Sequence, residues 1–387
     1  MHSGVDEVSY ALPPLWRVLT TFCYFLALSG AIGMTVTYVA AVAPALRRVA
    51  SATDAEAMRR RASSWLAGSG ALLLGAAYFQ LVSRVARANE GMAYADAFSP
   101  AAIGAFLTQP APEGAWVSRG SIILIQNVVI VIVALLLLSL STGAVRRRLD
   151  LVAAIAAPLA VVMSLVASVP GAPFKTLDEA VNKVLVQAHI VGGSVWVGGL
   201  VLLAVLAVGT RRRLSASGGI LWSVVWRNFG LVALVCVGAV VVSGLWLTWQ
   251  EVGAIEQLWT TTFGLILLVK IVLVLGMILA GALNQFWLMP RIARARAADA
   301  TSSLRALTLT HFPRVVWGEI VLAVGVLAIV PLLAGSARAE AGDQAAPPLD
   351  AGLLLLGLLL VATLAASFVA TVKASDLLGR RLAAAGS

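Results

Sequence analysis

The chain alternates between long apolar runs and short polar segments. Nine runs reach or approach the roughly 20 residues that an α-helix needs to cross the hydrocarbon core of a bilayer. Backbone polar groups in lipid must be satisfied within a segment, so each run is predicted to be a helix and not an open strand. We expect these helices at residues 16–45, 63–84, 117–140, 151–170, 182–209, 228–250, 262–288, 314–335 and 350–373. The pattern therefore predicts an all-α, polytopic transmembrane helical bundle of about nine spans.

Positive charge is concentrated in every second loop, which indicates the orientation of the bundle. The basic loops hold Arg47, Arg48, Arg59, Arg60, Arg61, Arg146, Arg147, Arg148, Arg211, Arg212, Arg213, Arg227, Arg291, Arg294, Arg296, Arg305, Arg314, Lys373, Arg380 and Arg381. The other loops hold Arg17, Arg84, Arg87, Arg119, Lys175, Lys183 and Arg338. Because cytoplasmic loops carry the excess of Lys and Arg, we expect the N-terminus outside and the C-terminus in the cytoplasm.

Composition agrees with a membrane protein. Of the 387 residues, 60% are hydrophobic and only 12% are charged, whereas charged residues make up about a quarter of an ordinary soluble domain. The net charge of +10 could suggest a nucleic-acid partner. Since the basic residues follow the alternating loops, we interpret them as topology signals. The expected surroundings are the lipid bilayer, and no nucleic-acid partner is expected.

The longest outer connection runs from Val85 to Trp116 and contains the sequence ADAFSPAAIGAFL. Its apolar and small residues predict a short helix lying at the membrane interface. We see no dinucleotide-binding, phosphate-loop, zinc-protease or nucleophile-elbow motif in a plausible context, so the chain is not expected to be an enzyme.

The segment 187–203, QAHIVGGSVWVGGLVLL, carries the most distinctive chemistry. On a helix, His189, Gly192, Gly193 and Trp196 share one face. These glycines, with the Gly198–Gly199 pair of the same run, allow a neighbouring helix to approach closely. An imidazole inside a membrane is a functional candidate by default. The alternative is that His189 only hydrogen-bonds a neighbouring helix, and the sequence leaves both readings open.

Two soft ligands are expected at the same depth as His189. Counting residues from the predicted outer ends places Met163 and Cys23 in the outer half of the membrane. An imidazole, a thioether and a thiol are ligands that suit Cu(I). Methionine and free cysteine are also ordinary core residues, so a packing role is the alternative for both.

A polar stripe follows the predicted seventh span. Lys270, Met277 and Asn284 repeat every seven residues and share a helix face. Apart from Asp350 at the very start of the last span, Glu319 is the one acidic residue within a predicted span. It could reach Lys270 only if both side chains were extended. The set Lys270, Asn284 and Glu319 is therefore a candidate polar path through the membrane, or a buried pair that fixes helix packing.

Four ordered motifs resemble the copper resistance protein D family. AHIVGGSVWVGGL resembles that family's histidine followed by W-V-G-G-L, and RNFGLVALVCVGAVVVSGLW resembles its R-F-x-x-x-A…G-L helix. TTFGLILLVKIVLV and ALNQFWLMPRI resemble its T-x-[YF]-G-x-x-L-x-x-K and A-x-N…L-x-P-R segments. Arg314 and Glu319 fall where the family places an arginine and a glutamate. The resemblance runs from about Val181 to Ala334.

The resemblance implies copper transport or homeostasis at the cytoplasmic membrane, with copper moving inward for resistance or for supply of cuproenzymes. The alternative is a non-transporting scaffold or assembly factor that delivers copper to a membrane oxidase. Expected partners are the copper ion and a periplasmic copper-binding protein or membrane oxidase. A haem enzyme is disfavoured, because three histidines are too few for several pairs of axial ligands.

The resemblance also suggests how the chain is divided. Residues 1–150 form an N-terminal three-helix part, 151–340 a copper resistance D-like membrane core, and 341–387 an additional C-terminal transmembrane helix. The chain departs from the family in two places. Gly171-Ala172-Pro173 stands where family members often carry Gly-His-Ala, and the ninth span exceeds the eight that the family commonly has.

Overall fold

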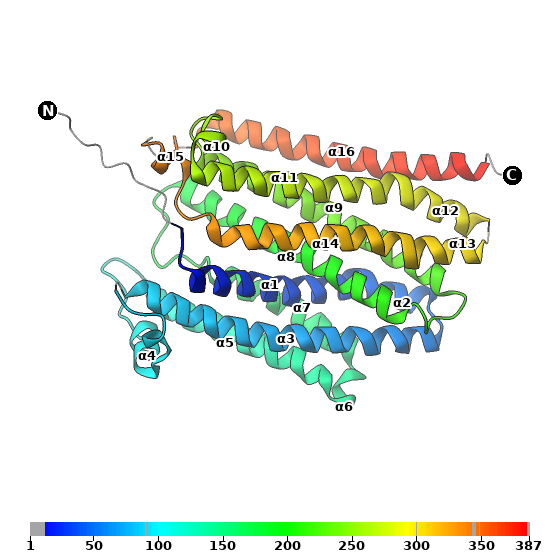
Figure 1. Ribbon diagram of the computed structural model, residues 1–387, viewed down its shortest axis with the longest axis horizontal. Helices are drawn as coiled ribbons and strands as arrows, with labels where there is room; N and C mark the ends of the chain where they lie inside the picture. Colours follow the sequence, from blue (N-terminus) through cyan, green and yellow to red (C-terminus); the bar gives the residue numbers. More distant parts are fainter. Residues whose placement is uncertain (1–11, 90, 299, 343–345, 348, 385–387) are drawn as a thin grey trace.

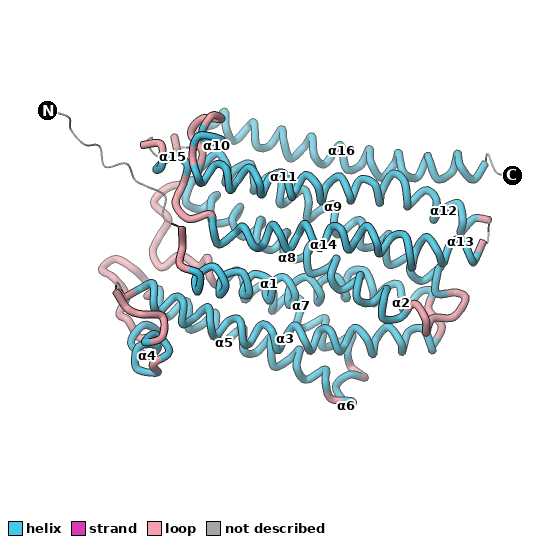
Figure 2. Tube along the Cα trace, in the orientation of Figure 1, coloured by secondary structure: helices cyan, strands magenta, loops and turns pink. Residues whose placement is uncertain are grey.

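The computed structural model describes residues 12–387 apart from 90, 299, 343–345, 348 and 385–387. Within this part of the chain there are helices and loops but no strands (Figure 2). Nine helical runs are long and apolar enough to cross a membrane, one for each predicted span. The prediction of an all-α bundle is confirmed, and the protein is a multi-pass membrane protein. Both chain ends lie outside the described residues.

The helices are α1 (Leu15–Thr37), α2 (Ala43–Val49), α3 (Ala52–Ala88), α4 (Pro100–Leu107), α5 (Arg119–Leu138), α6 (Gly143–Arg146), α7 (Leu149–Val166), α8 (Leu177–Thr210), α9 (Gly218–Glu251), α10 (Gln257–Thr260), α11 (Thr262–Leu283), α12 (Met289–Ala297), α13 (Thr301–Ala306), α14 (Phe312–Ile329), α15 (Ala337–Glu340) and α16 (Ala351–Ala384). Three π-helical segments, Tyr38–Val42, Asn284–Leu288 and Leu307–His311, join α1 to α2, α11 to α12 and α13 to α14.

Several helices extend beyond the apolar runs that predicted them. α3 begins at Ala52 and α9 at Gly218, about ten residues before the expected starts at 63 and 228. The added turns of α3 contain arginine and other polar residues, which continue a helix outside lipid as readily as apolar ones do. The added turns of α9 are mostly apolar and are buried in the bundle. The short helix expected within Val85–Trp116 is present as α4, which begins with Pro100 at its first turn.

The spans lie side by side with their axes roughly parallel (Figure 1). We name the two ends of the bundle after the helices found there: the α4 end also holds the start of α1, α10 and α15, and the α12 end also holds α2 and α13 (Figure 1). α3 and α5 form one edge, and α16 packs on α9 and α12 at the other. One buried cluster joins residues of α1, α3, α5, α7, α8, α9 and α14.

The closest approach in the bundle is between α1 and α8. A Cβ atom added to Gly198 would overlap the carbonyl oxygen of Ser29 and would lie 2.8 Å from the Cα of Gly33. A Cβ on Gly199 would meet Phe229 of α9 and the hydroxyl of Thr37. Only glycine permits backbones to come this near. The expected packing role of Gly198 and Gly199 therefore has a clear structural basis.

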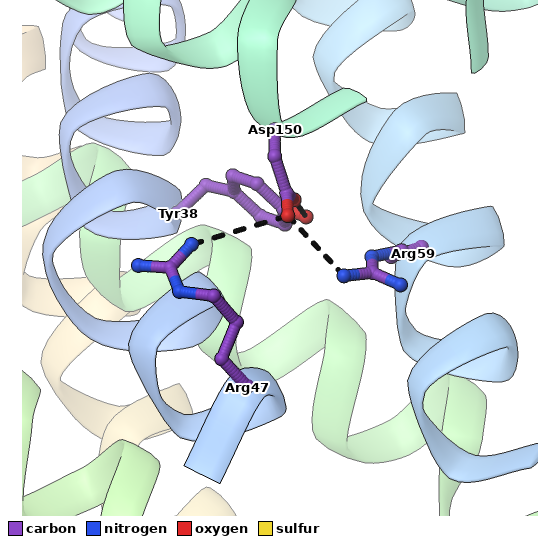
Figure 3. A network of polar contacts seen from close by, with 4 residues as sticks. All are labelled: Tyr38, Arg47, Arg59 and Asp150. Atoms are coloured by element: carbon purple, nitrogen blue, oxygen red, sulfur yellow. Dashed lines mark hydrogen bonds and ion pairs between the residues drawn. The ribbon is translucent and has the colours of Figure 1, made fainter. Parts of the chain in front are cut away.

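Carboxylates tie the helices together toward the α12 end. Asp150, in the first turn of α7, accepts a hydrogen bond of 2.5 Å from the Tyr38 hydroxyl and one of 3.2 Å from Arg59 of α3, with Arg47 at 3.9 Å (Figure 3). One carboxylate thus links the segment after α1 to α3 and α7.

Asp54 plays a similar part in the α8–α9 connection. It accepts hydrogen bonds from the backbone N–H and the hydroxyl of Ser215, at 2.9 and 2.6 Å. Arg305 closes the same loop by donating to the carbonyl oxygens of Arg211, Leu214 and Ser215. These contacts satisfy backbone groups that a helix end leaves without partners.

Candidate functional site

His189 lies on α8 and points toward α9. Its Nδ1 atom is 3.0 Å from the hydroxyl oxygen of Ser243, and its ring packs against Gly244, where an added Cβ would lie 3.5 Å from Cε1. Gly192, one turn further along α8, faces the same helix and would place a Cβ 3.3 Å from that of Ala239. The small residues on both helices therefore create the space that the imidazole occupies.

The partners of Ser243 define which nitrogen of His189 carries the proton. The Ser243 hydroxyl donates to the backbone carbonyl of Ala239, four residues earlier on α9. A hydroxyl has a single hydrogen, so it must accept the bond from His189. Nδ1 is then the donor, and in the neutral imidazole the lone pair lies on Nε2. A neutral His189 would thus offer Nε2 to a metal ion.

The neighbourhood of His189 also includes a cation. Lys270 on α11 is close enough to His189 for an electrostatic interaction between the two side chains. Both residues are half-buried. The structure therefore places Lys270 within electrostatic range of His189.

Met163 is buried on α7, but it faces other partners. Its side chain is fully buried, and its carbonyl oxygen accepts a hydrogen bond from Gln126 of α5. The next residue, Ser164, donates to Gln187 of α8 at 2.9 Å. Gln187 and His189 are two positions apart and so point in nearly opposite directions from the helix. α7 therefore contacts the face of α8 opposite to the one that carries His189.

Cys23 lies on the exposed surface of α1, which in a membrane faces lipid. The structure consequently does not gather His189, Met163 and Cys23 at one point. Within the described residues, no group of three or more His, Cys, Asp and Glu side chains is close enough to hold a metal ion. Depth along the membrane could be predicted by counting residues, whereas the direction of each side chain could not.

Two residues of the predicted polar path do meet. The Nδ2 atom of Asn284 donates to Oε1 of Glu319 at 2.8 Å, joining the segment after α11 to α14. Glu319 is 2% exposed and Asn284 is 8% exposed. The Oδ1 atom of Asn284 is buried and has no hydrogen-bond partner. Glu319 faces the bundle interior, as its charge required.

Lys270 does not form the extended pair with Glu319. The ion pairs among the described residues all involve Asp150. Glu319 is level with Asn284, which lies 14 residues from Lys270, roughly 21 Å along a helix axis. Met277, between them on α11, is buried in the apolar core. The predicted polar path is therefore not continuous. Its residues lie in two separate polar regions, with Lys270 near His189 and with Asn284 bonded to Glu319. Counting from the ends of the predicted spans 262–288 and 314–335 gives the same result, since Asn284 and Glu319 lie four and five residues from their respective ends.

Two of the three π-helical segments provide a backbone carbonyl that accepts a hydrogen bond from α9. Each π turn interrupts the regular hydrogen-bond pattern and leaves a carbonyl without its usual partner. Asn228 of α9 donates to Ala41 at 3.2 Å, and Trp226 of α9 donates to Thr308 at 3.0 Å. Two of these segments also carry Tyr38 and Asn284, which bond Asp150 and Glu319. The segments therefore hold the polar contacts of the bundle in place.

The motif residues divide into two groups. Gly192, Gly198, Gly199 and Trp196 are buried where helices meet. Gly193 is different, because a Cβ added there would meet nothing within 4 Å. Membership of a shared helix face was not sufficient to identify which glycines touch a neighbour.

Sequence reasoning missed the importance of Ser243 and Gln126. Ser243 was not singled out in the sequence analysis, yet it is the hydrogen-bond partner of His189. Gln126 interrupts the apolar run of α5, accepts a bond of 2.8 Å from Arg84 and donates to the hydroxyl of Tyr24. The amide pair Gln126–Asn127 within such a run is the signal that could have identified it, because a buried amide needs partners.

Comparison with known protein families finds a match in the part of the chain that follows His189. Residues 223–333 match the family model of copper resistance protein D. This confirms the family resemblance. The matched segment contains Ser243, Lys270, Asn284 and Glu319, while His189 lies before it. The searches of curated proteins and of solved structures return no match. A copper resistance family match on a bundle of membrane helices associates the protein with copper handling in a membrane.

Proposed function

We propose that the protein carries copper inward across the cytoplasmic membrane, and that Nε2 of His189 binds the ion during its passage. It acts as a carrier and not as an enzyme. The observation that supports this most directly is the chain of hydrogen bonds from His189 to Ser243 to the Ala239 carbonyl. That chain uses Nδ1 as the donor and so leaves Nε2 of the neutral imidazole for a metal ion.

Cu(I) is the form of copper that this site favours. Imidazole and sulfur ligands suit it better than oxygen ligands do, and His189 is surrounded by apolar helix faces. The absence of a multi-ligand cluster among the described residues suits brief binding during passage. Lys270 beside the site would repel a bound cation, which favours release over storage. Met163 and Cys23 remain proposals as ligands, and both would need a side-chain or helix movement to reach His189.

The alternative function is a scaffold that delivers copper to a membrane cuproenzyme without transporting it. Purified protein in sealed liposomes separates the two, because no client enzyme is present. A carrier loads the liposome interior with copper when Cu(I) is supplied outside. A scaffold binds copper but leaves the interior empty, and that result would contradict the proposal.

His189→Gln tests the role of the imidazole. Glutamine keeps a polar group of similar size that can still bond Ser243, but it lacks the aromatic nitrogen. We expect copper uptake to fall by at least ~100-fold, as for loss of a metal ligand or its direct support, with insertion and thermal stability unchanged. The matched control is His311→Gln, since His311 is exposed on a π-helical segment at the α12 end. Unchanged uptake and copper affinity in His189→Gln would leave the residue with a packing role only.

A further inference from the structure

Four arginines from three helices gather at the α4 end of the bundle. Arg17 is in the first turn of α1, Arg84 and Arg87 are in the last turns of α3, and Arg119 is the first residue of α5. Arg87 interacts electrostatically with each of the other three, and Arg84 also with Arg119. We call this group the arginine cluster.

Among the described residues, no carboxylate forms an ion pair with the arginine cluster, because both ion pairs are made by Asp150 toward the α12 end. Arg84 instead donates to the side-chain oxygen of Gln126 at 2.8 Å and lies over the ring of Tyr24. Arg87 donates to the carbonyl of Ser83. These are neutral partners, so mutual repulsion of the four positive charges is not cancelled within this part of the chain.

The position of the cluster is unusual for a membrane protein. It lies at the end of the bundle where the loops are poor in arginine, whereas topology requires positive charge only at the other end. The start of α5 adds the positive end of a 20-residue helix at Arg119. The four positive charges repel one another and lie at the end of the bundle where topology does not require them. Their presence there indicates that they bind an anion.

Aromatic rings beside the cluster indicate its position along the membrane normal. Trp16, next to Arg17, stacks on Tyr94 with ring centres 4.8 Å apart, and Tyr94 contacts Phe98 at 5.2 Å. Tryptophan and tyrosine gather at the level of the lipid headgroups. The anion available at that level in every bilayer is the lipid phosphate.

We propose that Arg17, Arg84, Arg87 and Arg119 bind the phosphate group of an anionic lipid headgroup. Guanidinium groups match the geometry of phosphate oxygens through paired N–H donors. Arg84 is already held in place by Gln126 and Tyr24, so it forms the fixed side of the site. The other three lie nearer the surface and complete it around the headgroup.

Native mass spectrometry of the purified protein with phosphatidylglycerol tests this inference. The variant R17Q/R87Q/R119Q keeps Arg84 and its buried partners, and thus the fold of α1, α3 and α5. The matched control, R211Q/R212Q/R213Q, removes the same charge from exposed arginines in the α8–α9 loop at the α12 end. We expect the first variant to bind phosphatidylglycerol at least ~tenfold more weakly than wild type, and the control to bind as wild type does.

Further arms of the experiment distinguish the source of the anion. Inorganic phosphate that displaces the lipid from wild type, but does not bind the cluster variant, would show that the phosphate group alone is recognised. Equal losses in the cluster variant and the control, or no loss in either, would overturn the proposal. The proposal would also be overturned if lipid bound only to a D6N/E7Q variant. In that case the acidic side chains of the N-terminus, and not a lipid, would occupy the arginine cluster in the wild type.

Discussion

Two helix pairs in this bundle are built on different principles. α1 and α8 meet through Ser29, Gly33 and Gly198, so that their backbones touch. α11 and α14 meet through leucines set over glycines, with Leu322 3.2 Å from the position of a Cβ on Gly276 and Leu273 equally near one on Gly325. The apolar window of α8 is 78% buried and that of α11 only 17%. The first pair is therefore the centre of the fold and the second lies at its lipid-facing side.

The difference extends to polar groups. The contact between α1 and α8 is made of small side chains and backbone, whereas the α11–α14 pair holds the Asn284–Glu319 hydrogen bond and an unpartnered amide oxygen. A side-chain interface can adjust when a charge or hydrogen bond changes, but touching backbones cannot. We infer that the α1–α8 pair acts as the scaffold and that any rearrangement for the proposed transport occurs at α11 and α14.

The largest effect is expected at the backbone contact. Gly198→Ala places a Cβ on the carbonyl of Ser29, and neither backbone can yield without separating the two helices. We expect a loss of about 3 kcal/mol in the free energy of unfolding, measured by thermal unfolding in detergent. Gly193→Ala is the control, because its Cβ meets nothing within 4 Å. Equal stability of the two variants would contradict the proposed scaffold.

A smaller effect is expected at the polar pair. Asn284→Leu and Glu319→Met each leave one buried polar group without its partner, while the double variant removes both. The double variant should therefore lose less free energy of unfolding than the two single variants lose in sum. The expected difference is about 1 kcal/mol, the value of a hydrogen bond within a membrane. Denaturant unfolding of the four proteins measures this coupling.

The control for this measurement is a second double-mutant cycle that combines Lys270→Met with Glu319→Met. Because Lys270 lies beside His189 and not beside Glu319, the losses of this pair should add. Coupling as strong as that of Asn284 and Glu319 would mean that one continuous polar path exists after all.

The order of spans could be predicted because lipid imposes one strong rule on sequence. Runs of apolar residues must be helices of a minimum length, and all nine appear in the structure. The helix ends were less predictable, since α3 begins with polar turns before its apolar run and α9 begins with buried turns ahead of its expected start. Hydropathy records where lipid ends and not where a helix ends.

The candidate site was predictable in its residues but only partly in its assembly. His189, Lys270, Asn284 and Glu319 stand out because charge or imidazole inside a membrane is costly. Their pairing depends on helix rotation and on the relative height of neighbouring helices, which no single sequence run determines. His189 therefore meets Ser243 and not Met163, and Glu319 meets Asn284 and not Lys270.

The smallest effect is expected where α15 contacts the start of α11. Glu340 of α15 accepts hydrogen bonds from the backbone N–H groups of Thr262 and Phe263, at 2.7 and 3.0 Å, and so closes the start of α11. Burial would raise the pKa of Glu340, but these N–H groups lower it, and the net result lies below the usual value of 4.5. A carboxylate at the start of a helix also stabilises the positive end of its dipole.

A lowered pKa in the folded state means that the stabilisation is complete at neutral pH, above the unfolded-state pKa. It is lost as the pH falls below 4.5 through the folded-state pKa, since protonation removes the charge that the N–H groups bind. Glu340→Gln should lower the free energy of unfolding by about 0.3–0.5 kcal/mol at pH 7, a value reduced by solvent screening. The difference from wild type should shrink toward zero below pH 4.5. A difference that stays constant across this range would show that Glu340 supports α11 by packing and not by charge.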